Sequence, residues 1–182
     1  MELIISNVID AYRENVHLIQ DPALRESEIV DSYYIEDRAL LWCGGRKVVV
    51  TSLPVEPAHV RYLQRAMGYA QLENLYPRQA SESLCEDILR EDALRRAIVA
   101  RLRGQGEVAL ISFVASPQVL AVAEALRQEG LEVSTPECPP ADRLWVRDDL
   151  DSKAGFRRFF AAIQPQLRGV RLPEGAIARD TA

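Results

Sequence analysis

Apolar residues recur every three or four positions in two stretches at the start of the chain. The first stretch covers about 2–19, and the second covers about 23–42. Such spacing places the apolar side chains on one face of a helix. Asp21-Pro22 separates the two stretches, and Gly44-Gly45 follows the second. The pattern therefore predicts an N-terminal helical segment over 1–45 that packs on the remaining chain.

Short apolar runs bounded by turn residues follow this segment. Lys47–Thr51 and Val108–Phe113 are the clearest runs, and Gln71–Tyr76 and Leu131–Ser134 are weaker ones. Runs of this length that are rich in valine, isoleucine and leucine are typical of buried strands in a parallel sheet. We expect each of them to form a strand.

Helical patterns separate these runs, at about 58–67, 83–102 and 118–128. Pro57 suits the first position of the first helix, and Ser116-Pro117 opens the last one. Strands that alternate with helices at this spacing predict βαβ units with right-handed crossovers. The expected fold is an α/β, Rossmann-like open and mostly parallel sheet with flanking helices and the N-terminal helical prelude.

The expected main domain covers 46–147, and 148–182 form a further helix with a linker. The turn Thr135-Pro-Glu-Cys-Pro-Pro140 precedes this last part, whose helix carries Phe156, Phe159 and Phe160. At 182 residues the chain is long enough for one domain with its own core.

Charge and cysteine content narrow the classes of partner. The net charge is −5, and basic residues alternate with acidic ones along most segments, which argues against duplex nucleic acid as a ligand. Cys43, Cys85 and Cys138 are widely spaced, so we expect no disulfide framework. The N-terminus has neither a signal-peptide nor a membrane-span pattern, and we expect a cytoplasmic protein without a membrane contact.

Small hydroxyl side chains stand where two predicted strands end. Thr51 and Ser52 follow the first clear strand, and Ser112 and Ser116 lie at the end of the second. Ligands of open α/β sheets bind at the carboxyl ends of strands, where hydroxyls and helix N–H groups hold an anion. These residues are candidates for binding a carboxylate or phosphate. Capping of the following turn or helix is the alternative role.

Other catalytic chemistry has little support in the sequence. It contains neither GxGxxG nor GxxxxGK[ST], and no spacing of His and Cys typical of a zinc site. An independent enzyme would have to use His59, on the opening turn of a helix, or a cysteine such as Cys43. Neither stands in a recognisable catalytic motif.

Three segments resemble the domain that precedes the ATP-binding lobes of ATP-grasp ligases. Thr51-Ser-Leu-Pro-Val-Glu-Pro57 follows a valine-rich strand, as in that family. Leu150-Asp-Ser-Lys-Ala-Gly-Phe-Arg-Arg-Phe-Phe160 is similar to its lysine-containing helix start. Gly169-Val-Arg-Leu-Pro-Glu-Gly175 is similar to its Gly-Val-x-x-Pro-x-Gly segment. The resemblance runs in order from about Arg46 to the end of the chain.

The resemblance implies a non-catalytic N-terminal domain of an ATP-dependent carboxylate-amine ligase. Such a domain supplies scaffold and part of the site for a small anionic or amino-acid-like substrate. It implies ATP-grasp lobes in cis as partner, with ATP and Mg²⁺ bound only by those lobes and no metal site in this chain. The family's lysine that approaches the nucleotide phosphates corresponds to Lys153. The chain alone is then not an active ligase.

Two further interpretations stay open. One is a stand-alone regulatory module that binds a small anion or a partner protein through the Thr51 and Ser112 loops. The other concerns assembly, because the apolar N-terminal helices can pack on a second subunit as readily as on their own sheet. A homodimer is therefore also an expectation.

Overall fold

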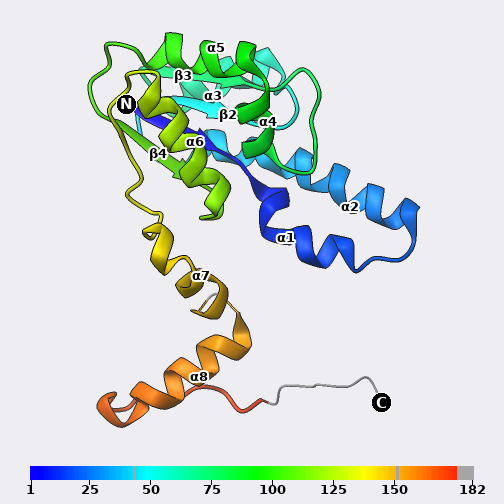
Figure 1. Ribbon diagram of the computed structural model, residues 1–182, viewed down its shortest axis with the longest axis vertical. Helices are drawn as coiled ribbons and strands as arrows, with labels where there is room; N and C mark the ends of the chain where they lie inside the picture. The colour runs from blue at the N-terminus through cyan, green and yellow to red at the C-terminus, as the bar shows by residue number, and fades with distance from the viewer. Residues whose placement is uncertain (43, 151, 176–182) are drawn as a thin grey trace. The chain divides into compact units, whose positions relative to one another are not determined.

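The computed structural model describes residues 1–42, 44–150 and 152–175 (Figure 1). Two compact units divide the chain, Met1–Cys138 and Pro139–Ala182. Each unit is described by itself below. The domain limits expected from the sequence, at 45/46 and 147/148, stay predictions.

A parallel sheet forms the centre of the first unit. Its strands stand in the order β3-β2-β1-β4-β5, and every pairing between them is parallel. The strands are β1 (Glu2–Ile5), β2 (Arg46–Val50), β3 (Gln71–Leu75), β4 (Val108–Ser112) and β5 (Val133–Ser134). The predicted α/β class with an open parallel sheet is confirmed.

Helices connect consecutive strands. From β1 to β2 the chain forms α1 (Val8–His17), α2 (Pro22–Tyr34) and the 3-10 helix η1 (Ile35–Leu41). The later connections contain α3 (Pro57–Ala66), then α4 (Leu84–Arg90) with α5 (Asp92–Leu102), and finally α6 (Pro117–Gln128). The single helix expected over 83–102 is divided, because Glu91 has an extended backbone between α4 and α5.

The two faces of the sheet bury different helices. On one face, Leu3 and Val50 pack with apolar side chains of α4, α5 and α6, such as Ile98. On the other face, Ile4 and Val49 pack with η1 and α3. Alternate side chains of a strand point to opposite faces, so each central strand contributes to both cores.

Strand β1 differs from the sequence-based expectation. The helix predicted over 2–19 begins at Val8, and the residues before Ser6 form the central strand, between β2 and β4. The prediction of helix for residues 2–5 is therefore wrong. Leu3, Ile4 and Ile5 are all fully buried, because both faces of a central parallel strand are covered. Ile5, Val8 and Ile9 are spaced as on one face of a helix across the two residues between β1 and α1, and this spacing hides the strand.

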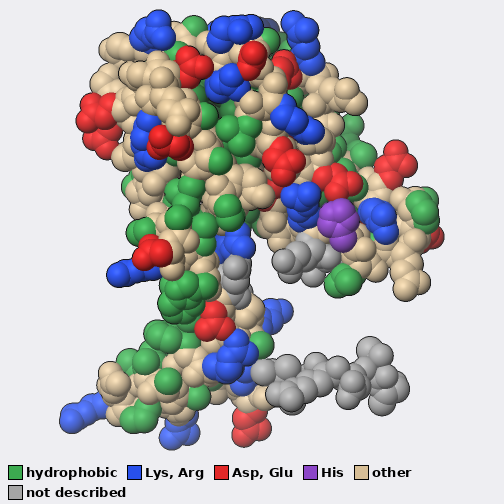
Figure 2. Space-filling view, in the orientation of Figure 1, with side chains coloured by type: hydrophobic (Ala, Val, Ile, Leu, Met, Phe, Trp, Pro, Cys, Tyr) green, Lys and Arg blue, Asp and Glu red, His purple; other side chains and the backbone are tan. Residues whose placement is uncertain are grey.

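The second unit contains the helix predicted around Phe156. Its elements are η2 (Ala141–Arg143), α7 (Trp145–Leu150), α8 (Lys153–Ile163) and η3 (Gln164–Gln166). Ser152 caps α8, where its hydroxyl accepts from the Gly155 N–H at 2.9 Å. Apolar side chains gather along this unit in Figure 2, and Trp145, Phe156 and Phe159 are among the exposed ones. Within the described residues, no helix has the length and apolar character needed to cross a bilayer.

The buried position of β1 predicts a contrast between two leucines in the stretch first expected to be one helix. Leu3 is fully buried, whereas Leu18 is 77% exposed. We expect Leu3→Ala to lower the free energy of unfolding by about 2–5 kcal/mol. The matched Leu18→Ala should change it by less than about 0.5 kcal/mol. Urea unfolding measures both, and similar losses in the two variants would contradict the position of β1.

Candidate functional site

The loops after the strands meet at the carboxyl edge of the sheet in the first unit. The strand order reverses at β1, because β2 lies on one side of it and β4 on the other. In open α/β sheets a ligand usually binds at such a reversal, between the loops that follow the two diverging strands. The segments after β1 and β4 are therefore the first place to look for a site.

Asn7 occupies this reversal point. Its side chain is fully buried, and its Oδ1 accepts from the backbone N–H groups of Phe113 at 3.0 Å and Val114 at 3.2 Å. Its Nδ2 donates to the Val114 carbonyl and to an Asp10 carboxylate oxygen, each at 3.0 Å. These peptide groups of the segment after β4 are thus bonded to the chain itself.

A buried carboxyl group lies at the next loop, after β2. Glu36 of η1 is fully buried, and its two carboxyl oxygens accept from the Ser52 N–H at 2.5 Å and the Ser52 hydroxyl at 3.0 Å. The Glu36 carbonyl accepts from the Ser6 hydroxyl at 2.9 Å. Glu36 therefore joins η1 to the ends of both β1 and β2. Burial raises the pKa of its carboxyl to about 8, although the Ser52 hydrogen bonds oppose this shift.

Thr51 is bonded within the same loop. Its hydroxyl accepts from Asn74 Nδ2 at 2.8 Å and donates to the Leu53 carbonyl at 2.7 Å. Asn74 Oδ1 accepts from the Val55 N–H at 2.9 Å. Asn74 of β3 therefore fixes the course of the loop on the β2 side.

A cleft of about 470 Å³ opens beside this loop, and we call it the β2 cleft. The loop residues Thr51, Leu53, Pro54 and Val55 line one part of it. The polar and aromatic lining consists of Tyr33, Tyr34, Asp37, Glu56 and His59. Its volume lies in the range of small-molecule sites.

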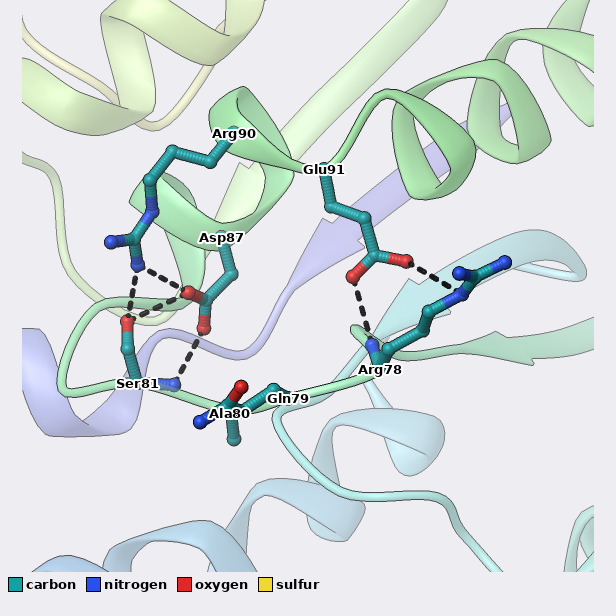
Figure 3. A pocket seen from close by; sticks show the side chains of 7 residues that line it. All are labelled: Arg78, Gln79, Ala80, Ser81, Asp87, Arg90 and Glu91. Atoms are coloured by element: carbon teal, nitrogen blue, oxygen red, sulfur yellow. Dashed lines mark hydrogen bonds and ion pairs between the residues drawn. The ribbon is translucent and has the colours of Figure 1, made fainter.

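The loop after β3 borders a second hollow, of about 430 Å³, which Figure 3 shows from close by. Arg90 of α4 donates to Asp87 at 2.7 Å and to the Ser81 hydroxyl at 2.9 Å, and Ser81 N–H donates to Asp87 at 2.8 Å. Arg78 and Glu91 form a further pair, in which the backbone N–H of Arg78 donates to a carboxylate oxygen of Glu91 at 2.8 Å. Both arginines already pair with carboxylates of the chain. These pairs hold the loop after β3 in place beside the hollow.

Tyr33 connects the two regions. It lines the β2 cleft, and its hydroxyl donates to the Ser81 carbonyl at 2.9 Å. Burial raises the pKa of the Tyr33 phenol to about 12, and the charges of Asp87 and Glu36 act in the same direction. The phenol therefore keeps its proton and its hydrogen bond at neutral pH, which holds this wall of the cleft in place.

The structure distributes the residues predicted from the sequence over several places. Thr51 and His59 line the β2 cleft, whereas Ser52 is buried, does not line the cleft and binds Glu36. Ser116 caps α6 through the Val119 N–H at 3.2 Å, and Ser112 ends β4. Neither of these two serines belongs to the cleft lining.

Two other predicted residues lie elsewhere. Lys153 is the first residue of α8, in the second unit. Cys43 lies outside the described residues.

Sequence reasoning missed the residues that organise the site. Asn7 and Glu36 each stand within or beside an apolar periodic stretch that was assigned to helix. A signal for Asn7 does exist, because an Asn directly before a helical pattern with an acid three residues later is typical of a helix start. Glu36 has no such signal, because Asp37 and Arg38 follow it directly and the three read as an ordinary charged segment.

A comparison with models of protein families identifies the family to which the chain belongs. The model of the pre ATP-grasp domain matches residues 36–128. The chain belongs to this family. No curated protein and no solved structure matches the chain. The matched part begins at Glu36 and ends with α6, so the pre-ATP-grasp domain family covers β2, β3, β4 and most of the cleft lining.

The buried Glu36 predicts a loss of stability with rising pH. Its pKa is about 8 in the folded protein and 4.5 without burial, so folding favours the protonated form. Its contribution is complete below pH 4.5 and is lost as the pH rises towards 8. The slope is roughly 1.4 kcal/mol per pH unit at most.

Urea unfolding across this pH interval tests this prediction. Glu36→Gln keeps an acceptor for Ser52 and should remove this part of the pH dependence. The exposed Glu26→Gln on α2 is the matched control and should keep it. Equal pH profiles for the wild type and Glu36→Gln would show that Glu36 does not titrate in this way.

Proposed function

We propose that the chain is the non-catalytic N-terminal domain of an ATP-dependent carboxylate-amine ligase, with part of the acceptor site in its β2 cleft. The observation that carries this proposal is the family match over 36–128. That range includes the loop after β2 and the start of α3, which line the cleft together with Asp37. The family and the cleft thus coincide in one part of the chain.

The role of this domain is to hold and orient the acceptor. Glu36 and Asn74 fix the loop after β2 from two sides, and Tyr33 holds the opposite wall. A rigid wall places a bound acceptor without further ordering, which is how positioning lowers the barrier of a bond-forming step. Activation of the carboxylate by ATP and Mg²⁺ belongs to the ATP-grasp lobes.

Lys153 has a separate role in the proposal. It is exposed at the first position of α8, where a positive charge is unfavourable beside the helix N-terminus. An exposed ammonium group at this position can bind a phosphate of the nucleotide. The proposal therefore assigns acceptor contacts to the first unit and a nucleotide contact to the second.

Steady-state kinetics test the acceptor site in the chain expressed together with the ATP-grasp lobes of its natural reading frame. Tyr34 is 67% exposed and lines the cleft. We expect Tyr34→Ala to raise the KM for the acceptor amine roughly tenfold, since a lost aromatic contact weakens binding. The KM for ATP should not change. Tyr76→Ala, at an exposed tyrosine outside the cleft lining, is the control.

The same assay of ADP release tests Lys153. Lys153→Met should raise the KM for ATP about tenfold or more, because it removes a charge-assisted hydrogen bond, and should leave the acceptor KM unchanged. Lys153→Arg should retain most of the affinity for ATP. An unchanged KM for ATP in Lys153→Met would refute the assigned role. A natural reading frame that lacks ATP-grasp lobes would refute the proposed function as a whole.

A further inference from the structure

The β2 cleft lies beside two groups of N–H and O–H donors that are suited to an anion. One is the Ser52 N–H with the Ser52 hydroxyl, and the other is the N-terminus of α3. Such groups hold phosphates and carboxylates in many α/β proteins. The cleft can accept an anionic ligand at these donors only if no group of the chain already binds them.

The chain's own carboxyl groups occupy both sets of donors. The carboxyl group of Glu36 accepts from both Ser52 donors. At the start of α3, Glu56 is the N-cap, and its side chain accepts from the Ala58 N–H at 3.4 Å. Pro57 has no N–H to offer. An incoming anion would have to displace a carboxyl group at either place.

The charge of the cleft lining also disfavours an anionic ligand. Asp37 and Glu56 are its carboxylates, and among the described residues that line the cleft none is Lys or Arg. Within the described part of the chain, no ion pair reaches either carboxylate. The neighbouring cation Arg38 lies over the Phe113 ring, 5.3 Å from its centroid, and does not line the cleft.

The remaining lining suits an apolar group attached to a cation. Leu53, Pro54 and Val55 offer apolar contact, and Tyr33 and Tyr34 contribute aromatic rings. Ammonium groups bind well where carboxylates stand close to aromatic rings, since both attract positive charge. The two carboxylates come from different elements, since Asp37 belongs to η1 and Glu56 is the N-cap of α3.

We propose that the β2 cleft binds the ammonium group of a primary amine between Asp37 and Glu56, with the apolar part of the amine against Leu53 and Pro54. This inference rests on the proposed function, because it names the chemistry of the acceptor. It replaces the anionic ligand expected from Thr51 and Ser52 with a cationic one.

Binding is tested on the chain itself by NMR titration of the nitrogen-labelled protein at neutral pH. The probes are benzylamine, benzyl alcohol and benzoate, which share a ring and differ in charge. We expect benzylamine to shift the amide signals of Leu53, Val55 and His59 with one Kd, in the range of about 1 mM. Benzyl alcohol should bind about tenfold more weakly, and benzoate should leave these signals unchanged.

Paired variants separate charge recognition from general damage. Asp37→Asn with Glu56→Gln keeps the shape of both side chains and should raise the Kd for benzylamine about tenfold. Glu107→Gln with Glu132→Gln makes the same change in net charge at exposed positions before β4 and β5, and should leave the Kd unchanged. The spectra themselves report whether each variant is folded.

Each other outcome overturns the inference in a recognisable way. Equal affinities for benzylamine and benzyl alcohol would exclude charge recognition, and shifts caused by benzoate alone would restore the anion site. No shift with any probe would exclude the cleft as an amine site. The titration uses neither ATP nor the ATP-grasp lobes, so a failed ligase assay beside intact amine binding would overturn only the proposed function.

Discussion

The carboxyl group of Glu36 holds the loop after β2 against the segment that covers it. Two donors of Ser52 bind its oxygens, and its own carbonyl accepts from Ser6 after β1. The position of η1, and with it Asp37 on the cleft wall, follows from this contact. Because the group is fully buried, folding has to keep it protonated or accept the cost of a buried charge. The Glu36 side chain thereby fixes the loop after β2 that forms one part of the cleft and holds the helix that carries Asp37.

Most of the sheet could be predicted from the sequence because its strands stand between clear turn residues. The runs at β2 and β4 are short, apolar and separated from their neighbours by glycine or proline, which gives them unambiguous limits. Strand β1 lacks such a boundary, since only Ser6 and Asn7 separate it from α1. An apolar run beside a helix fits both periodicities, and only the pairing of β1 with β2 and β4 distinguishes them.

The candidate site was less accessible to sequence reasoning, for a different physical reason. The rule that hydroxyls after a strand bind ligands points to the loop that borders the β2 cleft, and Thr51 does line the cleft. It gave no information on whether the donors of Ser52 are already bonded. That depends on Glu36, which lies sixteen positions earlier in the chain. Long-range pairing of this kind leaves no local pattern, so the bonding of the Ser52 donors to Glu36 could not be derived before the fold was known.

Asn7 has a consequence for the energetics of binding. A loop that becomes ordered only when a ligand binds lowers the affinity for that ligand. Here the Asn7 Oδ1 already accepts from the Phe113 and Val114 N–H groups. The centre of the carboxyl edge therefore needs no ligand to be complete, and a ligand bound at the β2 cleft spends none of its affinity on ordering that centre. In this respect the domain is preassembled, because the side chain of Asn7 ties the segment after β4 to the end of β1.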